Sequence, residues 1–280
     1  MKKPLKTLVY TGPACLLLVL LAALLQAFFG APVLYAGLRY EVYARDLDEV
    51  SALAFDKAGD LYTTLEKRHG QGELLQIHKG KAHKLLDNLD KPDGILLRDS
   101  TLYLTNEAGS HGLAVYTSGS LRYLDGTHDA EGIAGADHGR ILVIEDRKAG
   151  GRLLRIEPST ARVEVLLEGL HEGEGVCQTP GGDIYFVEKT SDHLSRYRDG
   201  KISTAVAGLD SPAFLNCLDD GSILLTEDRT NFGRLLHYRQ GAVEVLATHL
   251  RSPQSVIIGP DGAYYLAEQR KSRILRIYAP

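Results

Sequence analysis

Hydrophobic and polar residues follow two different patterns along this chain of 280 residues. Residues 8–29 are almost continuously apolar, and no Asp, Glu, Lys or Arg occurs between Lys6 and Arg39. From residue 38 onward, short apolar stretches alternate with tight turns rich in Gly and Asp, and no 3.6-residue helical pattern competes with them. The pattern predicts one long apolar helix followed by an all-β domain.

The apolar run has the length of a transmembrane helix, which needs about 20 such residues. Lys2, Lys3 and Lys6 precede it and favour a cytoplasmic N-terminus. A cleaved signal peptide is the alternative, but its apolar core spans about 7–15 residues before a small-x-small site. We therefore expect a cytoplasmic tip (1–6), an uncleaved signal anchor (7–29), a tether (30–37) and an extracytoplasmic domain (38–280). The chain has no Asn-x-Ser/Thr site in the β domain, which favours a bacterial envelope and the periplasm.

The β domain contains six copies of one unit. Each copy has an apolar strand, a tight turn, a second apolar strand and a Glu, and two further apolar stretches follow. The terminal acids are Glu66, Glu107, Glu145, Glu188, Glu227 and Glu268. Four short strands in each unit of about 40 residues are typical of a β-propeller blade.

The two ends of the repeat predict how the ring closes. The last unit stops after three strands, at residues 273–277, whereas the apolar stretch 38–43 precedes the first unit without a partner of its own. This stretch is expected to complete the sixth blade as its outer strand, which removes an open sheet edge. The predicted fold is an all-β, six-bladed propeller with four-stranded blades, preceded by a single transmembrane helix.

The first residue of each inner strand is expected to reach the central channel. These residues are Ser51, Asp93, Glu131, Glu174, Ala213 and Gln254. Unpaired carboxylates held together repel, so some would stay protonated unless a cation joins them. Oxygen ligands from Asp93, Glu131, Glu174 and Gln254 suit a divalent cation, and calcium in particular. Alternatively, the acids hydrate a wide channel or meet Lys and Arg from neighbouring loops.

Histidines lie in loops on the same face. His128 and His171 stand three residues before two of the channel acids, and His69, His111 and His193 follow second strands. A neutral imidazole could take a proton from water near a cation, so His128 and His171 are the candidate catalytic bases. Surface histidines are also common without any such role.

The repeated Glu and the cysteines are expected to be structural. A residue present in every blade at one register would accept backbone N–H groups or pair with cations such as Arg147, Arg229 or Arg270. Alternatively, Glu107, Glu145 and Glu188 orient the channel acids. Cys177 and Cys217 lie in inner strands of adjacent blades and are predicted to be unpaired buried residues rather than a disulfide.

Composition and charge narrow the function. Hydrophobic residues make up 44% and charged residues 24% of the chain, which excludes a disordered protein. A net charge of -4 provides no basic surface for a phosphate backbone, so nucleic acid is not an expected partner. The fold alone does not decide between an enzyme and a binding protein.

The motifs Pro92-Asp93-Gly94-Ile95, Glu131-Gly132-Ile133 and Glu174-Gly175-Val176 give the chain a family resemblance. With the blade pattern, residues 38–280 resemble the six-bladed propellers of the senescence marker protein/gluconolactonase family and, more distantly, paraoxonases and strictosidine-synthase-like proteins. The resemblance implies a channel calcium on Asp93, Glu131 and Glu174, lactone or ester hydrolysis, and roles for His128 or His171 like those of the paraoxonase histidines. Ser51 stands where the family pattern has a Glu, and the Asn residues of its ring are missing.

Two functions of different classes follow. The first is a membrane-anchored, calcium-dependent lactone or ester hydrolase. The second is a non-catalytic propeller that acts as a binding or accessory subunit of a membrane or envelope protein complex.

Overall fold

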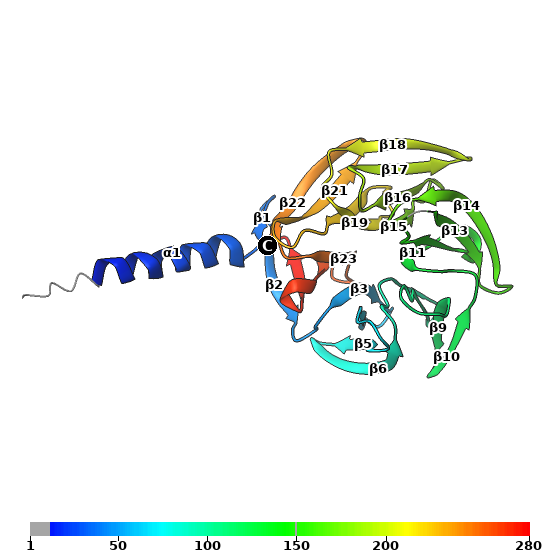
Figure 1. The fold of residues 1–280 in the computed structure, drawn as a ribbon, viewed down its shortest axis with the longest axis horizontal. Helices are drawn as coiled ribbons and strands as arrows, with labels where there is room; N and C mark the ends of the chain where they lie inside the picture. Colours follow the sequence, from blue (N-terminus) through cyan, green and yellow to red (C-terminus); the bar gives the residue numbers. More distant parts are fainter. Residues whose placement is uncertain (1–11, 149) are drawn as a thin grey trace, which may run out of the picture.

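Six antiparallel sheets surround a central channel (Figure 1). The computed structural model describes residues 12–148 and 150–280. The sheets form the blades of a propeller. Within each blade, the strands lie side by side from the channel to the outer rim. The predicted six-bladed, all-β fold is confirmed.

The blades follow one another in chain order. Blade 1 contains β3 (Val50–Phe55), β4 (Leu61–Leu65), β5 (Gly72–His78) and β6 (Lys81–Leu89). Blade 2 contains β7 (Ile95–Arg98), β8 (Thr101–Leu104), β9 (Leu113–Thr117) and β10 (Ser120–Leu124). Blade 3 contains β11 (Ala130–Gly135), β12 (Ile141–Glu145), β13 (Gly151–Glu157) and β14 (Arg162–Leu170).

The second half of the ring repeats this order. Blade 4 contains β15 (Gly173–Gln178), β16 (Ile184–Glu188), β17 (His193–Arg198) and β18 (Lys201–Ala207). Blade 5 contains β19 (Pro212–Cys217), β20 (Ile223–Glu227), β21 (Gly233–Arg239) and β22 (Ala242–Leu250). Blade 6 contains β23 (Pro253–Ile258), β24 (Tyr264–Glu268) and β25 (Arg273–Tyr278). Two short 3₁₀ helices, η1 (Asp137–Gly139) and η2 (Gln269–Lys271), lie in turns.

An N-terminal strand closes the ring as predicted. β2 (Arg39–Ala44) pairs antiparallel with β25, and Arg39 lies opposite Tyr278. The residues expected to be a tether are partly ordered as well, because β1 (Val33–Leu34) pairs with β22 and adds a fifth strand to blade 5. The attachment of the N-terminal segment therefore spans two neighbouring blades.

The hydrophobic core lies between adjacent blades. Leu142, Ile144 and Leu153 of blade 3 pack with Val176 and Phe186 of blade 4, and all five are buried. Each blade can bury both faces only because it has a neighbour on either side, so the closed ring is the stable unit.

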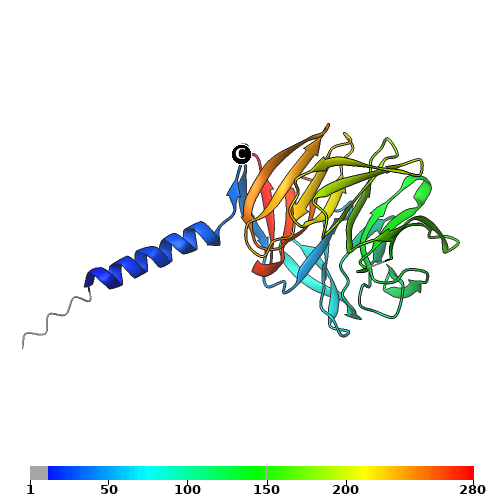
Figure 2. The same cartoon turned by 45° about the horizontal axis from the view of Figure 1, so that its top comes forward.

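Helix α1 (Gly12–Gly30) extends away from the propeller (Figures 1 and 2). Its described leucines are exposed, including Leu16, Leu17 and Leu18 with 63–70% exposed surface. Within the described residues, no helix reaches both the length and the apolarity expected of a membrane span. The cytoplasmic tip and the first residues of the predicted signal anchor lie outside the described part of the chain.

The prediction for two of the cysteines is wrong. Cys177 of β15 and Cys217 of β19 form a disulfide with a Cα–Cα distance of 5.5 Å. Although no strand ladder joins β15 to β19, inner strands of adjacent blades converge towards the channel. This convergence brings the two side chains within the usual disulfide range.

Candidate active site at the channel mouth

Six side chains from the beginnings of the inner strands form a ring, defined here as the inner ring. Its members are Ser51, Asp93, Glu131, Glu174, Ala213 and Gln254, as the sequence predicts, and all are buried. The Ser51 hydroxyl donates a hydrogen bond to the Asp93 carboxylate across the boundary between blades 1 and 2. The ring thus places three acids of consecutive blades at one end of the channel.

Glycines set the close spacing of these acids. A Cβ on Gly132 would lie 2.2 Å from the carbonyl oxygen of Glu174, and one on Gly175 would lie 2.2 Å from that of Ala213. Only a residue without a side chain permits this approach of neighbouring inner strands. The Glu-Gly motifs therefore hold the acid-bearing segments of adjacent blades together.

A second set of side chains, defined here as the outer ring, follows the second strand of each blade. Its members are Glu66, Glu107, Asp146, Lys189, Asp228 and Gln269. Each of them donates its backbone N–H to the carbonyl of a residue two positions before an inner-ring residue. Those acceptor residues all have φ between 46° and 59°, and they are Glu49, Lys91, Asp129, Glu172, Ser211 and Ser252. Each blade therefore contributes one residue to the inner ring and one residue to the outer ring.

The repeated Glu does not occupy one register in all six blades. Glu145, Glu188, Glu227 and Glu268 accept the backbone N–H of a residue in the preceding loop, at distances of 2.6–3.0 Å. Asn106 does this in blade 2, where it accepts the N–H of Asp90, and Leu65 takes the corresponding place in blade 1. The structural role is thus confirmed for four blades, whereas Glu66 and Glu107 lie one residue further and join the outer ring.

The cations that pair with these capping acids are not the predicted ones. Arg152, Arg234 and Arg273, at the start of third strands, bind Glu145, Glu227 and Glu268. Arg147 and Arg229 instead pair with the loop acids Asp129 and Asp210.

Two lysines neutralise part of the acid cluster. Lys91 lies between three carboxylates: its Nζ binds Glu107, lies 3.4 Å from Asp93 and lies 3.6 Å from Glu131. Lys189 lies on the other side, with its Nζ 3.0 Å from Glu174 and 3.8 Å from Asp228. This arrangement is the second of the sequence-based alternatives, in which loop cations meet the channel acids.

Burial and mutual repulsion separate the pKa values of the acids. Burial is the largest opposing influence on Asp93, but the Lys91 ammonium and hydrogen bonds lower its pKa to about 2. Burial, reinforced by the charge of Asp93, raises the pKa of Glu131 well above its usual value. Burial outweighs the Lys189 ion pair and raises the pKa of Glu174 to about 7. The same cluster therefore contains one acid with a lowered pKa and two acids with raised pKa values, and Glu174 titrates near neutral pH.

Only part of the predicted metal site comes together as predicted. Oxygens of Asp93, Glu107 and Glu131 lie within 4.8 Å of one another. Glu107 is a new member of this set, while Glu174 pairs with Lys189 and Gln254 lies on blade 6. Calcium needs six to eight oxygen ligands, but the Lys91 ammonium already contacts all three acids. As arranged, these residues do not fit a divalent cation together with that lysine.

The predicted catalytic histidines lie in exposed loops. His128 and His171 each donate a backbone N–H to a capping Glu, and the His171 ring lies 2.9 Å from the Lys148 carbonyl. In the described part of the chain, no hydrogen bond or ion pair joins either imidazole to an inner-ring acid. Their role as bases stays a prediction.

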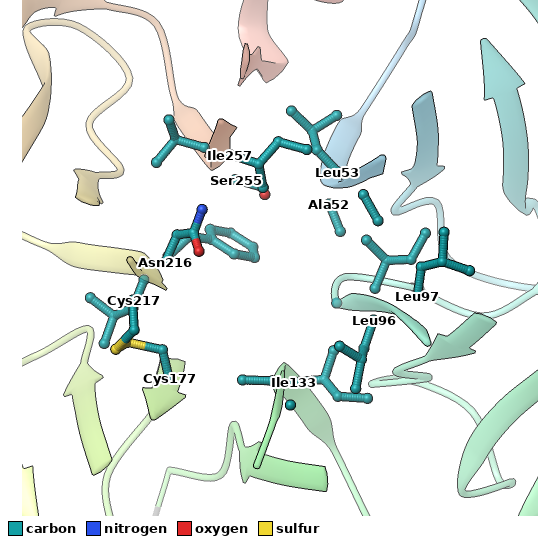
Figure 3. A pocket seen from close by; sticks show the side chains of 18 of the residues that line it. Ala52, Leu53, Leu96, Leu97, Ile133, Cys177, Asn216, Cys217, Ser255 and Ile257 are labelled. Atoms are coloured by element: carbon teal, nitrogen blue, oxygen red, sulfur yellow. A yellow bond between two sulfur atoms is a disulfide. The ribbon is translucent and has the colours of Figure 1, made fainter. Parts of the chain in front are cut away.

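A cavity of about 350 Å³ lies between the inner strands. Leu53, Leu97, Ile133 and Ile257 provide apolar walls, and Asn216 provides an amide (Figure 3). The Cys177–Cys217 disulfide forms part of one wall. The lining residues follow the inner-ring positions along the inner strands, and the acids and lysines of the cluster are not among them.

Structural comparison with known proteins supports the fold, whereas the sequence comparisons found no match. No family model and no curated protein matches the chain. A gluconolactonase structure from Xanthomonas campestris has a TM-score of 0.75 and 14% identity, covering 92% of this chain and 93% of that one. An auxiliary nutrient binding protein from Bacteroides thetaiotaomicron has a TM-score of 0.70 and 13% identity, covering 86% and 76%.

Virginiamycin B lyase from Staphylococcus aureus is also similar, with a TM-score of 0.60 and 14% identity, covering 86% of this chain and 98% of the lyase. Each identity is low enough that the likeness concerns the fold alone. The chain therefore has the six-bladed propeller fold of the gluconolactonase-like proteins, in agreement with the resemblance of its motifs.

Proposed function

We propose that the channel mouth hydrolyses a small lactone or ester, with Glu174 as general base and Lys189 as electrostatic partner. The observation that carries this proposal is a buried carboxyl group with a pKa of about 7 that pairs with a lysine, in a propeller that has a cavity between its inner strands. Groups with strongly perturbed pKa values next to a cavity are typical of catalytic sites. The fold of the gluconolactonase structures is compatible with this activity.

The proposed reaction uses side chains of the channel mouth together with water and the substrate. Ionised Glu174 takes a proton from a water molecule, whose oxygen attacks the carbonyl carbon of the substrate. The Lys189 ammonium stabilises the charge that develops on the carbonyl oxygen. The bond from the carbonyl carbon to the ring or ester oxygen then breaks, and the carboxyl group of Glu131, whose pKa is raised by burial, supplies a proton to that leaving oxygen. The product is a hydroxy acid, or an acid and an alcohol.

We place the propeller outside the cytoplasm, attached to a membrane through α1. The disulfide supports this location, because such bonds persist in oxidising compartments. The exposed leucines of α1 also support it, because a helix that projects from the propeller with an apolar surface has to find an apolar environment. A bacterial periplasm fits both observations.

The test is hydrolysis of a panel of lactones and aryl esters by the full chain in mild detergent. We expect Glu174→Gln to lower kcat by about 10²–10⁴-fold, as expected for loss of a general base. The rate of the unmodified chain should rise with pH through about 7, since the base must be ionised. Glu168→Gln, which changes an exposed acid on β14, is the matched control. Equal rates for Glu174→Gln and the unmodified chain would exclude this mechanism.

A binding function is the second candidate, favoured by the largely apolar lining of the cavity. The similar fold of an auxiliary nutrient binding protein is compatible with it. In this case the propeller serves as a binding or accessory subunit of a membrane or envelope complex, and α1 packs against a membrane protein. A stoichiometric partner that is lost when residues 1–36 are replaced by an unrelated anchor would support this function.

A further inference from the structure

The backbone fixes Lys91 at a position that the other blades fill differently. Lys91 has a φ of 52°, and its carbonyl accepts the N–H of Glu107. The corresponding residues of the other blades are acids or serines: Glu49, Asp129, Glu172, Ser211 and Ser252. Among the six blades, blade 2 therefore combines a lysine at this position with Asp93 in the inner ring and Glu107 in the outer ring.

The Lys91 ammonium lies in the space that a metal ion would need. Oxygens of Asp93, Glu107 and Glu131 lie within 4.8 Å of one another, and Nζ lies within 3.6 Å of an oxygen of each. The Lys91 side chain is only 15% exposed, so it has little freedom to turn away. A calcium ion bound 2.3–2.6 Å from these oxygens would clash with the ammonium and repel it.

Protein side chains compensate part of the negative charge of this cluster. One ammonium faces three carboxyl groups, and the Asp93 carboxylate also accepts a hydrogen bond from Ser51. Glu131 is 4% exposed, and its Oε2 makes no hydrogen bond in the described structure.

We propose that Lys91 is the resident cation of this channel and replaces a divalent ion, so that removing its ammonium opens a divalent-cation site on Asp93, Glu107 and Glu131. This inference does not depend on the hydrolase proposal. It concerns what neutralises the ring, and it holds equally for a binding protein.

The test compares calcium and manganese binding to the full chain and to Lys91→Gln in mild detergent, after chelator treatment and dialysis. We expect the unmodified chain to retain no stoichiometric ion and to show the same Tm with calcium or chelator. We expect Lys91→Gln to bind one ion per chain, at least about 100-fold more tightly, and to gain stability when calcium is added. Lys67→Gln is the matched control, because Lys67 pairs with Asp48 outside the ring.

Two results would overturn the proposal. One is an ion in the unmodified chain that disappears in Glu131→Gln, because the lysine and the metal would then coexist. The other is a folded Lys91→Gln chain that binds no divalent ion. If Lys91→Gln does not fold, metal analysis of the unmodified chain and of Lys91→Arg decides, since both should be free of bound ions.

Discussion

Blades 3–6 and blades 1–2 use the same repeat for different purposes. In blades 3–6, the Glu at the end of the second strand caps the preceding loop and leaves the following position for Asp146, Lys189, Asp228 or Gln269. In blades 1 and 2, the corresponding capping positions hold Leu65 and Asn106, and the Glu comes one residue later. The acids of blades 1 and 2 thereby belong to the channel mouth.

This comparison shows how a one-residue shift changes the role of an acid. Side chains of a strand alternate between its two faces, so a shift of one position moves a side chain to the opposite side. Glu145 and Glu107 look alike in the repeat, yet Glu145 binds Arg152 and a loop N–H, while Glu107 binds Lys91. Blades 1 and 2 have exchanged a structural acid for a charged group at the channel.

The largest expected effect comes from removing a capping acid. Glu145→Ala should lower the free energy of unfolding by about 3 kcal/mol, because it leaves Arg152 and the His128 N–H without their buried partner. Urea denaturation of the detergent-solubilised chain measures this loss.

Glu66→Gln provides the contrast in the outer ring. Burial raises the pKa of Glu66 well above its usual value, which favours the uncharged carboxyl group that a neutral amide resembles. We expect a change below about 1 kcal/mol at pH 7, in the range of neutral hydrogen bonds. Equal losses of unfolding free energy in Glu145→Ala and Glu66→Gln would mean that acids at the two registers stabilise the fold equally, which would contradict the comparison.

The sequence contains enough information to predict the fold and the inner ring. Hydrophobic periodicity and the unpaired stretch at residues 38–43 predict the blades and their closure, which depend on local pattern and on the pairing of edges. The position at the start of each inner strand also identifies Glu131 and Glu174 as members of the inner ring. The strand pattern repeats in every blade, so each copy supports the interpretation of the others.

Features that depend on exact register or on contacts between blades are harder to predict. Glu66 and Glu107 fit a period near 40 residues, since a shift of one residue is smaller than the variation in loop length. Asn106 next to Glu107 was the available indication that blade 2 differs. The convergence of β15 and β19, which permits the disulfide, and the reach of Lys91 towards three acids depend on the three-dimensional spacing of blades.

The next prediction concerns the inner ring. It is that the stability of the folded chain depends on pH through Glu174. Between pH 4.5 and 7, folded chains keep a proton on Glu174 that unfolded chains release. This stabilising contribution is complete below pH 4.5 and is lost as pH rises through 7. Glu174→Gln should match the unmodified chain near pH 4.5 and exceed its stability at pH 8 by about 2–3 kcal/mol. Thermal melting across this range measures the difference, and parallel curves for the two chains would contradict it.

The last prediction tests the capping position in blade 2, where the expected loss is smaller than that of Glu145→Ala. Asn106 accepts the N–H of Asp90 and donates to the carbonyl of His111, so Asn106→Leu gives blade 2 the residue that blade 1 has. We expect a loss of about 1 kcal/mol, since both bonds are uncharged and the loop is partly exposed to water. Hydrogen exchange should show faster exchange of the Asp90 amide, while the amides of blade 3 stay unchanged. A loss as large as that of Glu145→Ala would mean that hydrogen bonding at this register, rather than the buried ion pair with arginine, makes the capping position important in blades 3–6.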